Sequence, residues 1–204
     1  NWEYFFQTLP EVASKLDVTL GLTLAAAFFS LLLGIVFALI AYYKVPVLSQ
    51  LLKVWSSFMR GTPAIAQLFF FYYGLANVSS VILQMSPLVA VAVIMSLHMS
   101  CFMGESIRAA LISVDDGQRD AAKAFGMTGF QMTVRVVLPQ AIRVALPPLF
   151  NDLISLFKLS SLAYLVGLRD VMGAAKIEAN NTYQFFECYA CVIVVYWAIS
   201  LVLM

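Results

Sequence analysis

Several polar side chains interrupt an otherwise apolar stretch between residues 141 and 167. They are Asn151, Asp152, Lys158, Ser160 and Ser161. An ionisable group inside a long apolar segment is energetically costly, and such a group usually has a function. Asp152 and Lys158 are six positions apart, so they could form an ion pair only if the helix is broken between them. The set therefore indicates either a ligand-binding path or an internal salt bridge that braces a broken helix.

Two further groups could carry chemistry in apolar surroundings. His98 could titrate near neutral pH in a polar environment, or it could stay neutral and hydrogen-bonded between helices. Cys188 and Cys191 have the C-x-x-C spacing, but a redox pair needs an exposed and readily formed thiolate, which an apolar helix disfavours. We therefore expect two buried cysteines and keep a membrane thiol–disulfide oxidoreductase as an alternative.

The composition is typical of a protein that crosses a membrane several times. Of the 204 residues, 62% are hydrophobic and 11% are charged, whereas soluble domains have roughly 25% charged residues. The net charge of +1 does not favour nucleic acid as a partner. The three cysteines do not form a recognisable disulfide framework.

Apolar runs of about 20 residues are long enough to cross a bilayer. They predict an all-α membrane protein with five transmembrane helices in a single domain that covers residues 1–204. Aromatic residues near the start predict an interfacial helix, and residues 169–182 predict a short surface helix. We expect Pro147-Pro148 to break the fourth span, whose polar groups should then face protein or a watery cavity. The predicted spans are residues 18–43, 62–76, 87–111, 141–167 and 183–204.

The most highly charged segment lies between the third and fourth spans, at residues 115–139. Asp115 or the following aspartate can cap the start of a short helix, and Gly126 can end it. Thr128 can cap a second short helix. We expect that helix to end before Pro139, because a proline disfavours helical geometry in the preceding residue. Two short helices that are too polar for lipid predict a docking element outside the membrane.

This loop resembles the EAA loop in permease subunits of ATP-binding-cassette (ABC) importers. That pattern contains Glu-Ala-Ala, a glycine four residues later, and a more distant Leu-Pro. Here it reads Asp120-Ala121-Ala122, Gly126 and Leu138-Pro139, with Asp in place of Glu. The flanking segments resemble the polar amino acid branch of the family, which includes histidine, glutamine, arginine and cystine permeases. These segments are Arg60-Gly61-Thr62-Pro63, Glu105-Ser106-Ile107-Arg108, Gly117-Gln118, Leu138–Arg143 and Asn151-Asp152.

The resemblance implies that residues 115–139 form a cytoplasmic coupling helix held by a separate ATPase subunit. We expect the small side chains of Ala121, Ala122 and Ala124 to let that partner approach closely. The implied ATPase-coupling residues are Gly117, Gln118, Asp120, Ala121, Ala122, Gly126, Leu138 and Pro139. The implied gate or structural residues are Arg60, Gly61, Thr62, Pro63, Glu105 and Arg108, of which Glu105 and Arg108 can pair at i,i+3.

The same resemblance implies a transporter subunit, not an enzyme. The sequence contains no G-x-x-x-x-G-K-[ST] motif, so we expect the chain to bind no cofactor directly and ATP and Mg to act through the partner ATPase. The expected partners are two ABC ATPase subunits, a second permease copy or homologue, an extracytoplasmic amino acid-binding protein and membrane lipid. Together they would couple ATP hydrolysis to alternating access.

The distribution of Lys and Arg predicts the orientation. Most of these residues lie in segments 44–60 and 108–143, and cytoplasmic loops carry the excess of positive charge. We therefore expect a multi-pass protein of the bacterial cytoplasmic (inner) membrane with its N-terminus outside. No signal peptide is recognisable. Because the chain lacks an initial Met and a basic flank after the last span, we also expect further residues at both ends.

For an importer of this kind, the polar set is the best candidate for a substrate path, and His98 is a further candidate. A zwitterionic amino acid needs an anionic and a cationic partner, and Asp152 and Lys158 supply one of each. In the family a polar Asp or Asn usually follows the lysine, whereas here Leu159 follows. This difference favours an uncharged or cystine-like amino acid. A second alternative is an ion-driven amino acid carrier, although the inverted repeats found in many such carriers are not recognisable in this sequence.

Overall fold

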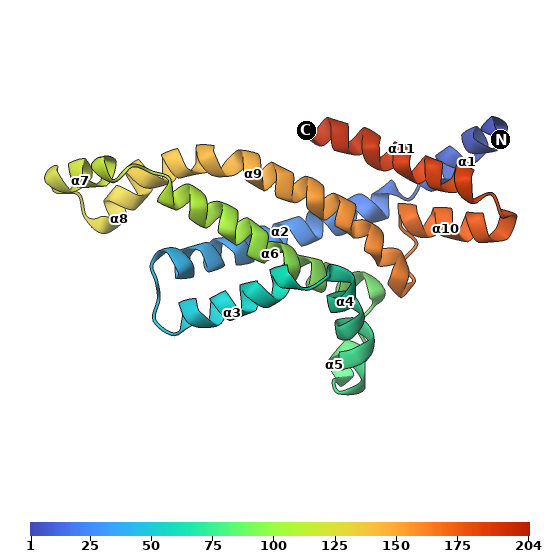
Figure 1. Ribbon diagram of the computed structural model, residues 1–204, viewed down its shortest axis with the longest axis horizontal. Helices are drawn as coiled ribbons and strands as arrows, with labels where there is room; N and C mark the ends of the chain where they lie inside the picture. The colour runs from blue at the N-terminus through green and yellow to red at the C-terminus, as the bar shows by residue number, and fades with distance from the viewer. The chain divides into compact units, whose positions relative to one another are not determined.

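The computed structural model describes residues 1–204 and contains helices but no β-strands (Figure 1). The chain forms two compact units. The first contains residues 1–28, 62–96 and 153–204, and the second contains residues 29–61 and 97–152. Three long helices begin in one unit and end in the other: α2 (Leu16–Tyr42), α6 (Pro87–Ile112) and α9 (Leu138–Leu159).

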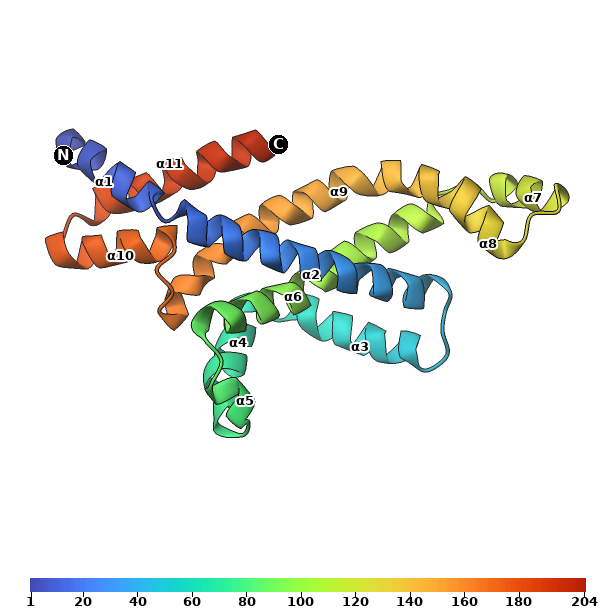
Figure 2. The same ribbon diagram turned by 180° about the vertical axis from the view of Figure 1, so that it is seen from behind.

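Three helices of the first unit pack side by side in both views (Figures 1 and 2): α1 (Trp2–Ala13), α10 (Val171–Thr182) and α11 (Phe185–Leu203). Their shared core includes the fully buried Cys188 and Cys191, which are free thiols. The buried cysteines therefore have the structural role that the sequence predicts. Residues 171–182 form a helix as expected, but α10 is partly buried and is not a purely surface helix.

Besides these helices and its parts of α2, α6 and α9, the first unit contains short or irregular helical turns. They are α4 (Ala64–Phe69), a π-helical turn (Phe70–Gly74), a 3-10 turn (Leu75–Asn77), α5 (Ser80–Leu83) and a 3-10 helix (Ser160–Val166). The side-chain amide of Gln67 donates to Thr62 Oγ1 at 2.7 Å, which fixes the start of α4. The hydroxyl of Tyr73 donates to the carbonyl of Leu165 at 3.3 Å. These bonds hold chain segments that have little regular structure.

The second unit contains α3 (Leu48–Gly61), α7 (Asp116–Ala124), α8 (Gly129–Met132) and a π-helical turn (Thr133–Val137). Within it, α2 and α6 approach each other closely at two glycines. A Cβ added to Gly34 would lie 3.0 Å from the backbone nitrogen of Gly104. Small residues at such positions allow helices in a membrane to pack backbone against backbone. Nearby, a small core of Ala110, Leu111, Val114, Val137, Ala141 and Ala145 lies at the α7 end of the unit.

Four helical stretches are long and apolar enough to cross a membrane: residues 16–42, 87–112, 129–166 and 185–203. They correspond to the first, third, fourth and fifth spans that the sequence predicts. The predicted second span, residues 62–76, consists of the short turns described above. The count of five spans therefore stays a prediction. The amphipathic helix α3, which precedes that segment, was not expected from the sequence.

Two expectations about prolines are wrong. The helix that follows Thr128 does not end before Pro139, because the π-helical turn joins α8 to α9 and the Leu138 amide donates to the Thr133 carbonyl. The π-helical turn changes the hydrogen-bond register just before Pro139, so the helix continues although proline has no N–H to donate. Pro147 and Pro148 do not break the fourth span, since both lie inside α9. The helix changes to 3-10 geometry only at Ser160 and ends at Gly167, whose φ is +85°.

The start of α10 depends on a buried carboxylate, Asp170, which is 0% exposed. One carboxylate oxygen accepts from the Gly173 amide at 2.8 Å, while the other is buried without a hydrogen-bond partner. A Cβ at Gly173 would collide with the Leu168 carbonyl oxygen, so the cap requires glycine there. Burial raises the pKa of Asp170 from its ordinary value to about 6.

This shift predicts a pH-dependent stability. The pKa of Asp170 is about 6 in the folded protein and about 3.9 in an unfolded chain, so the folded state binds the proton more tightly. Stability should therefore fall as pH rises from about 4 to about 6, by on the order of 2–3 kcal/mol. Asp170→Asn keeps the capping oxygen and removes the titration.

We expect the melting temperature of purified Asp170→Asn protein to fall less than that of wild type over this pH range. Asp17→Asn, at an exposed position in the first turn of α2, is the matched control and should behave like wild type. Parallel pH profiles for wild type and Asp170→Asn would contradict the assignment.

Candidate functional site

The charged segment between α6 and α9 folds as two short, well-capped helices. Asp115 caps α7, because its carboxylate accepts from the Gly117 amide at 2.8 Å. Asp116 in the first turn and Lys123 in the last turn both complement the helix dipole. The sequence prediction of a helix that begins at this aspartate pair is confirmed.

The end of α7 is a tight reversal centred on Gly126, whose φ is +73°. The Gly126 amide donates to the Lys123 carbonyl at 2.8 Å, and the Met127 amide donates to the Ala122 carbonyl at 3.1 Å. This pattern is the Schellman motif, which favours glycine because other residues are strained at positive φ. The reversal that the sequence predicts at Gly126 is confirmed.

A capping box then starts α8. The Gln131 amide donates to Thr128 Oγ1 at 3.3 Å, and the Thr128 amide donates to the Gln131 side chain at 3.0 Å. Such reciprocal bonds satisfy donors that a helix start otherwise leaves open. The two helices and their turn therefore hold a defined shape without needing a partner to complete their backbone hydrogen bonds.

Arg119 attaches α7 to the rest of the second unit. Its guanidinium donates to Asp116 Oδ1 at 2.6 Å and to the Leu111 carbonyl, in the last turn of α6, at 2.7 Å. It also lies 5.9 Å from the centre of the Tyr42 ring at the end of α2. Sequence reasoning missed this role. The sequence offered one signal: Arg119 is the fourth residue of a short helix that begins shortly after a predicted span.

The exposed surface of α7 and α8 combines small, charged and aromatic residues. Ala122 is 3% exposed and packs inward, so it supports the helix from within and does not supply the partner-facing methyl group that we expected. Phe125 and Phe130 flank the reversal and are 86% and 78% exposed. The exposed residues of the predicted set are Gly117, Gln118, Asp120, Ala121, Gly126, Leu138 and Pro139.

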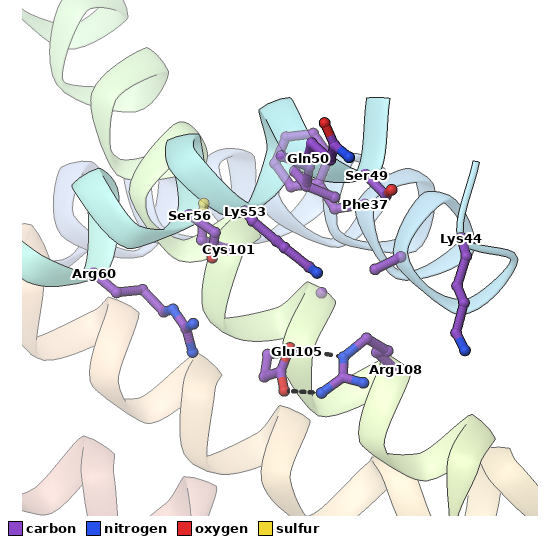
Figure 3. A pocket seen from close by; sticks show the side chains of 13 residues that line it. Phe37, Lys44, Ser49, Gln50, Lys53, Ser56, Arg60, Cys101, Glu105 and Arg108 are labelled. Carbon is purple, nitrogen blue, oxygen red and sulfur yellow. Dashed lines mark hydrogen bonds and ion pairs between the residues drawn. The ribbon is translucent and has the colours of Figure 1, made fainter. Parts of the chain in front are cut away.

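The residues predicted at a gate form two local arrangements. Glu105 and Arg108 are paired on α6, with Arg108 Nε donating to Glu105 Oε2 at 2.9 Å. Arg60 and Gly61 end α3, whereas Thr62 belongs to the first unit and binds Gln67. Pro63 caps the start of α4. The helix is interrupted at Thr62-Pro63, between α3 and α4. The i,i+3 pair that the sequence predicts between Glu105 and Arg108 is present (Figure 3).

The Asp152–Lys158 ion pair, one of the two alternatives for the polar set, is not formed. Asp152 accepts a hydrogen bond from Ser106 at 2.9 Å and forms no salt bridge with Lys158. The idea of an Asp152–Lys158 brace is therefore wrong, because the helix runs unbroken between them. Asn151 and Lys158 are both exposed. His98 lies on α6, with its ring 5.3 Å from that of Phe102.

Lys158 and Ser161 instead line a pocket of about 430 Å³ in the first unit, whose walls also include Tyr196, Trp197 and Ser200. Ser161 donates to the Lys158 carbonyl at 2.8 Å. Ser160 is buried and donates to the Phe157 carbonyl at 2.6 Å, with the Tyr196 hydroxyl 3.5 Å away. Of the predicted path residues, the structure thus brings Lys158 and Ser161 together in one cavity, and Asp152 is not among its lining residues.

A family profile for the "Binding-protein-dependent transport system inner membrane component" matches residues 30–204. The chain belongs to this family. Its members are permease subunits of ABC transporters in the inner membrane, which work with ATPase subunits and a binding protein and form dimers. The family resemblance stated from the sequence is therefore confirmed, and the chain is a transporter subunit rather than an enzyme. The oxidoreductase and ion-driven carrier alternatives do not fit this family.

Similar proteins are known from sequence and structure. The chain is 40% identical over 202 residues to the "Probable amino-acid permease protein YxeN" of Bacillus subtilis (strain 168), covering 99% of this chain and 90% of that protein. It is 35% identical over 196 residues to the "L-cystine transport system permease protein TcyL" of the same organism, covering 94% and 82%.

Among solved structures, "Crystal structure of an amino acid ABC transporter with histidines" matches with a TM-score of 0.91 and 29% identity. The match covers 100% of this chain and 94% of that chain. The arrangement of helices is therefore that of an ABC importer permease.

The geometry of Arg119 predicts that Arg119→Ala loosens α7 without unfolding the permease. The variant loses the hydrogen bond to the Leu111 carbonyl, which is worth roughly 1–3 kcal/mol, and the ion pair with the exposed Asp116, which contributes less. Amide hydrogen exchange in residues 117–127 should accelerate by about tenfold or more. Lys123→Ala on the same helix is the matched control, because its pair with Asp120 is largely exposed and contributes little. Equal exchange rates in both variants would show that Arg119 does not anchor α7.

Proposed function

We propose that this chain is the transmembrane permease subunit of an ATP-driven importer for amino acids. Support comes from the names of its relatives and of the structure it resembles, which refer to amino acids. The observation that carries the proposal is the exposed, self-capped α7–α8 element at the EAA-like sequence. A rigid projection of this kind fits a subunit that is moved by a separate ATPase and has no nucleotide-binding loop of its own.

In this proposal residues 115–139 form the coupling element. The importer contains two permease chains, and each of the two ATPase subunits holds the coupling element of one chain. The contacts are made by Gly117, Gln118, Asp120, Ala121 and Gly126, with Phe125 and Phe130 as the apolar part of the surface. Ala122, Leu138 and Pro139 support the element from within or connect it to α9. ATP and Mg act through the ATPases, and a second permease copy or a homologue completes the pathway. An extracytoplasmic binding protein delivers the amino acid.

The proposed topology has one transmembrane domain over residues 1–204, with five spans, the N-terminus outside and α7 in the cytoplasm. The excess of Lys and Arg in segments 44–60 and 108–143 supports this orientation. The second crossing is assigned to residues 62–76, which form α4 and the turns that follow it. Gly61 to Pro63 then join the cytoplasmic helix α3 to this span.

For the substrate we propose an uncharged or cystine-like amino acid. The pocket beside Lys158 offers one cation, Ser161, and walls that include Tyr196 and Trp197, without an acidic lining residue. A cation suits the substrate carboxylate, whereas a positively charged side chain would meet no counter-charge there. The other proposed path residues, Asn151, Asp152, Ser160 and His98, lie on α6, on α9 and at its end.

Gly126→Val tests the coupling role. Valine at φ +73° is strained, so the reversal between α7 and α8 should deform. In proteoliposomes with ATPase and binding protein, we expect the variant to insert normally and to lose most transport, with ATP hydrolysis no longer stimulated by substrate. Gly129→Val is the matched control, because its φ is not positive and a Cβ there meets open space. Coupled transport by Gly126→Val at the wild-type level would refute the role.

Lys158→Ala tests the substrate path. Loss of the cation should weaken uptake of an uncharged amino acid by about tenfold or more, since a charge-assisted hydrogen bond to the carboxylate disappears. Lys158→Arg should retain much of the uptake, and Lys15→Ala in the same unit should match wild type. Uptake measured with radiolabelled cystine and glutamine would decide the matter. Unchanged rates and selectivity in Lys158→Ala would remove this residue from the path.

A further inference from the structure

A cluster of buried oxygen atoms lies in the first unit where α10 begins. Its members come from four elements that meet there: Thr19 of α2, Ser160 of the 3-10 helix after α9, Asp170 before α10, and Tyr196 of α11 (Figure 1). Thr19, Ser160 and Asp170 are each 0% exposed, and Tyr196 is partly buried. The coupling role does not use this cluster, and of its members only Ser160 is a proposed path residue.

The contacts within the cluster are short. The Val171 amide donates to Thr19 Oγ1 at 3.2 Å, which places the Thr19 hydroxyl beside Asp170. The Tyr196 hydroxyl is 3.5 Å from Ser160 Oγ, and it also lies close enough to Thr19 and Asp170 for both to act on it electrostatically. The four side chains therefore surround one small region.

The hydroxyl protons of this region are already used elsewhere. Thr19 donates its proton to the Lys15 carbonyl at 3.3 Å, and Ser160 donates its proton to the Phe157 carbonyl at 2.6 Å. A hydroxyl has only one proton to donate, so both oxygens offer lone pairs to any further partner. Asp170 Oδ1 accepts from the Gly173 amide, but the buried Oδ2 has no donor. The cluster is thus rich in acceptors and lacks a partner for one carboxylate oxygen.

The charge of Asp170 is also not balanced by a side chain, since none of the ion pairs in the structure includes it. A buried carboxylate is costly unless it is hydrogen-bonded, paired with a cation or bound to a metal ion. Hard cations prefer oxygen ligands such as carboxylates and other oxygen donors. A single carboxylate with neutral hydroxyls matches a monovalent ion, and the chain has no group of three His, Cys, Asp or Glu side chains that could hold a metal ion.

We propose that Asp170, Thr19, Ser160 and Tyr196 bind a sodium ion. The ion gives Asp170 Oδ2 the partner that the protein does not supply, and the three hydroxyl oxygens contribute lone pairs. It joins α2, α10, α11 and the end of α9 at one point. It also fixes Tyr196, whose side chain lines the cavity beside Lys158. The inference does not depend on which solute the importer carries.

The test measures binding of radiolabelled sodium to the purified transporter complex in detergent, with N-methylglucamine as the background cation. The buffer has a pH well above the Asp170 pKa of about 6, so that the carboxylate is ionised. We expect saturable binding that unlabelled sodium displaces and N-methylglucamine does not. Asp170→Asn keeps the capping oxygen but removes the charge, and it should weaken binding by about tenfold or more.

The matched control is Asp17→Asn, which removes an exposed carboxylate from the same unit and should bind sodium like wild type. Thr19→Val should weaken binding and Thr19→Ser should restore it, because serine keeps the oxygen. This second pair decides the matter if Asp170→Asn does not fold.

Sodium should also raise the melting temperature of wild type but not of Asp170→Asn, since a ligand that binds only the folded state stabilises it. The pH dependence predicted for Asp170 is accordingly measured in sodium-free buffer. Absence of saturable binding to wild type, or equal binding by Asp170→Asn, would overturn the proposal and assign the unpartnered oxygen to an internal water molecule.

Discussion

The guanidinium of Arg119 is the interaction that attaches α7 to the ends of two long helices. It binds a carbonyl in the last turn of α6, a carboxylate in the first turn of α7, and the face of Tyr42 at the end of α2. A lysine could not make these contacts together, because its single ammonium group lacks the planar fork of donors. Under the proposed function, a displacement of α7 would therefore be passed to the ends of α2 and α6.

This connection matters because α7 is too short to be stable by itself. It has nine residues, and isolated helices shorter than about 12–15 residues are marginal in water. Its stability comes from Asp115 at the start, the Schellman motif at the end, and the buried methyl group of Ala122. Phe125 and Phe130 are left exposed on either side of the reversal, and paired exposed aromatics of this kind suit a protein contact.

Local signals allowed most of the functional element to be predicted from sequence. Helix caps and glycines at positive φ depend on a few neighbouring residues. Asp115 and Thr128 could therefore be predicted as N-caps, and Gly126 as the end of a helix, without a structure. The prolines could not, because their effect depends on context. The π-helical turn before Leu138 lets the helix continue past Pro139, and α9 also continues through Pro147 and Pro148. Arg119 and Ala122 were also missed as supports, since their roles depend on contacts between segments distant in sequence.

The hydrogen bonds at the end of α9 limit which groups there could bind the substrate. Ser160 and Ser161 both donate their hydroxyls to carbonyls three residues earlier, as the helix tightens into 3-10 geometry. Those donors are engaged in ending the helix, which leaves the Lys158 ammonium as the charged donor of that cavity. Under the proposed function, the substrate carboxylate is then recognised by charge, and the substrate side chain by the shape of largely apolar walls. Apolar walls discriminate weakly, by about 1–3 kcal/mol per methylene, so fine selectivity is expected to come from the binding protein that delivers the amino acid.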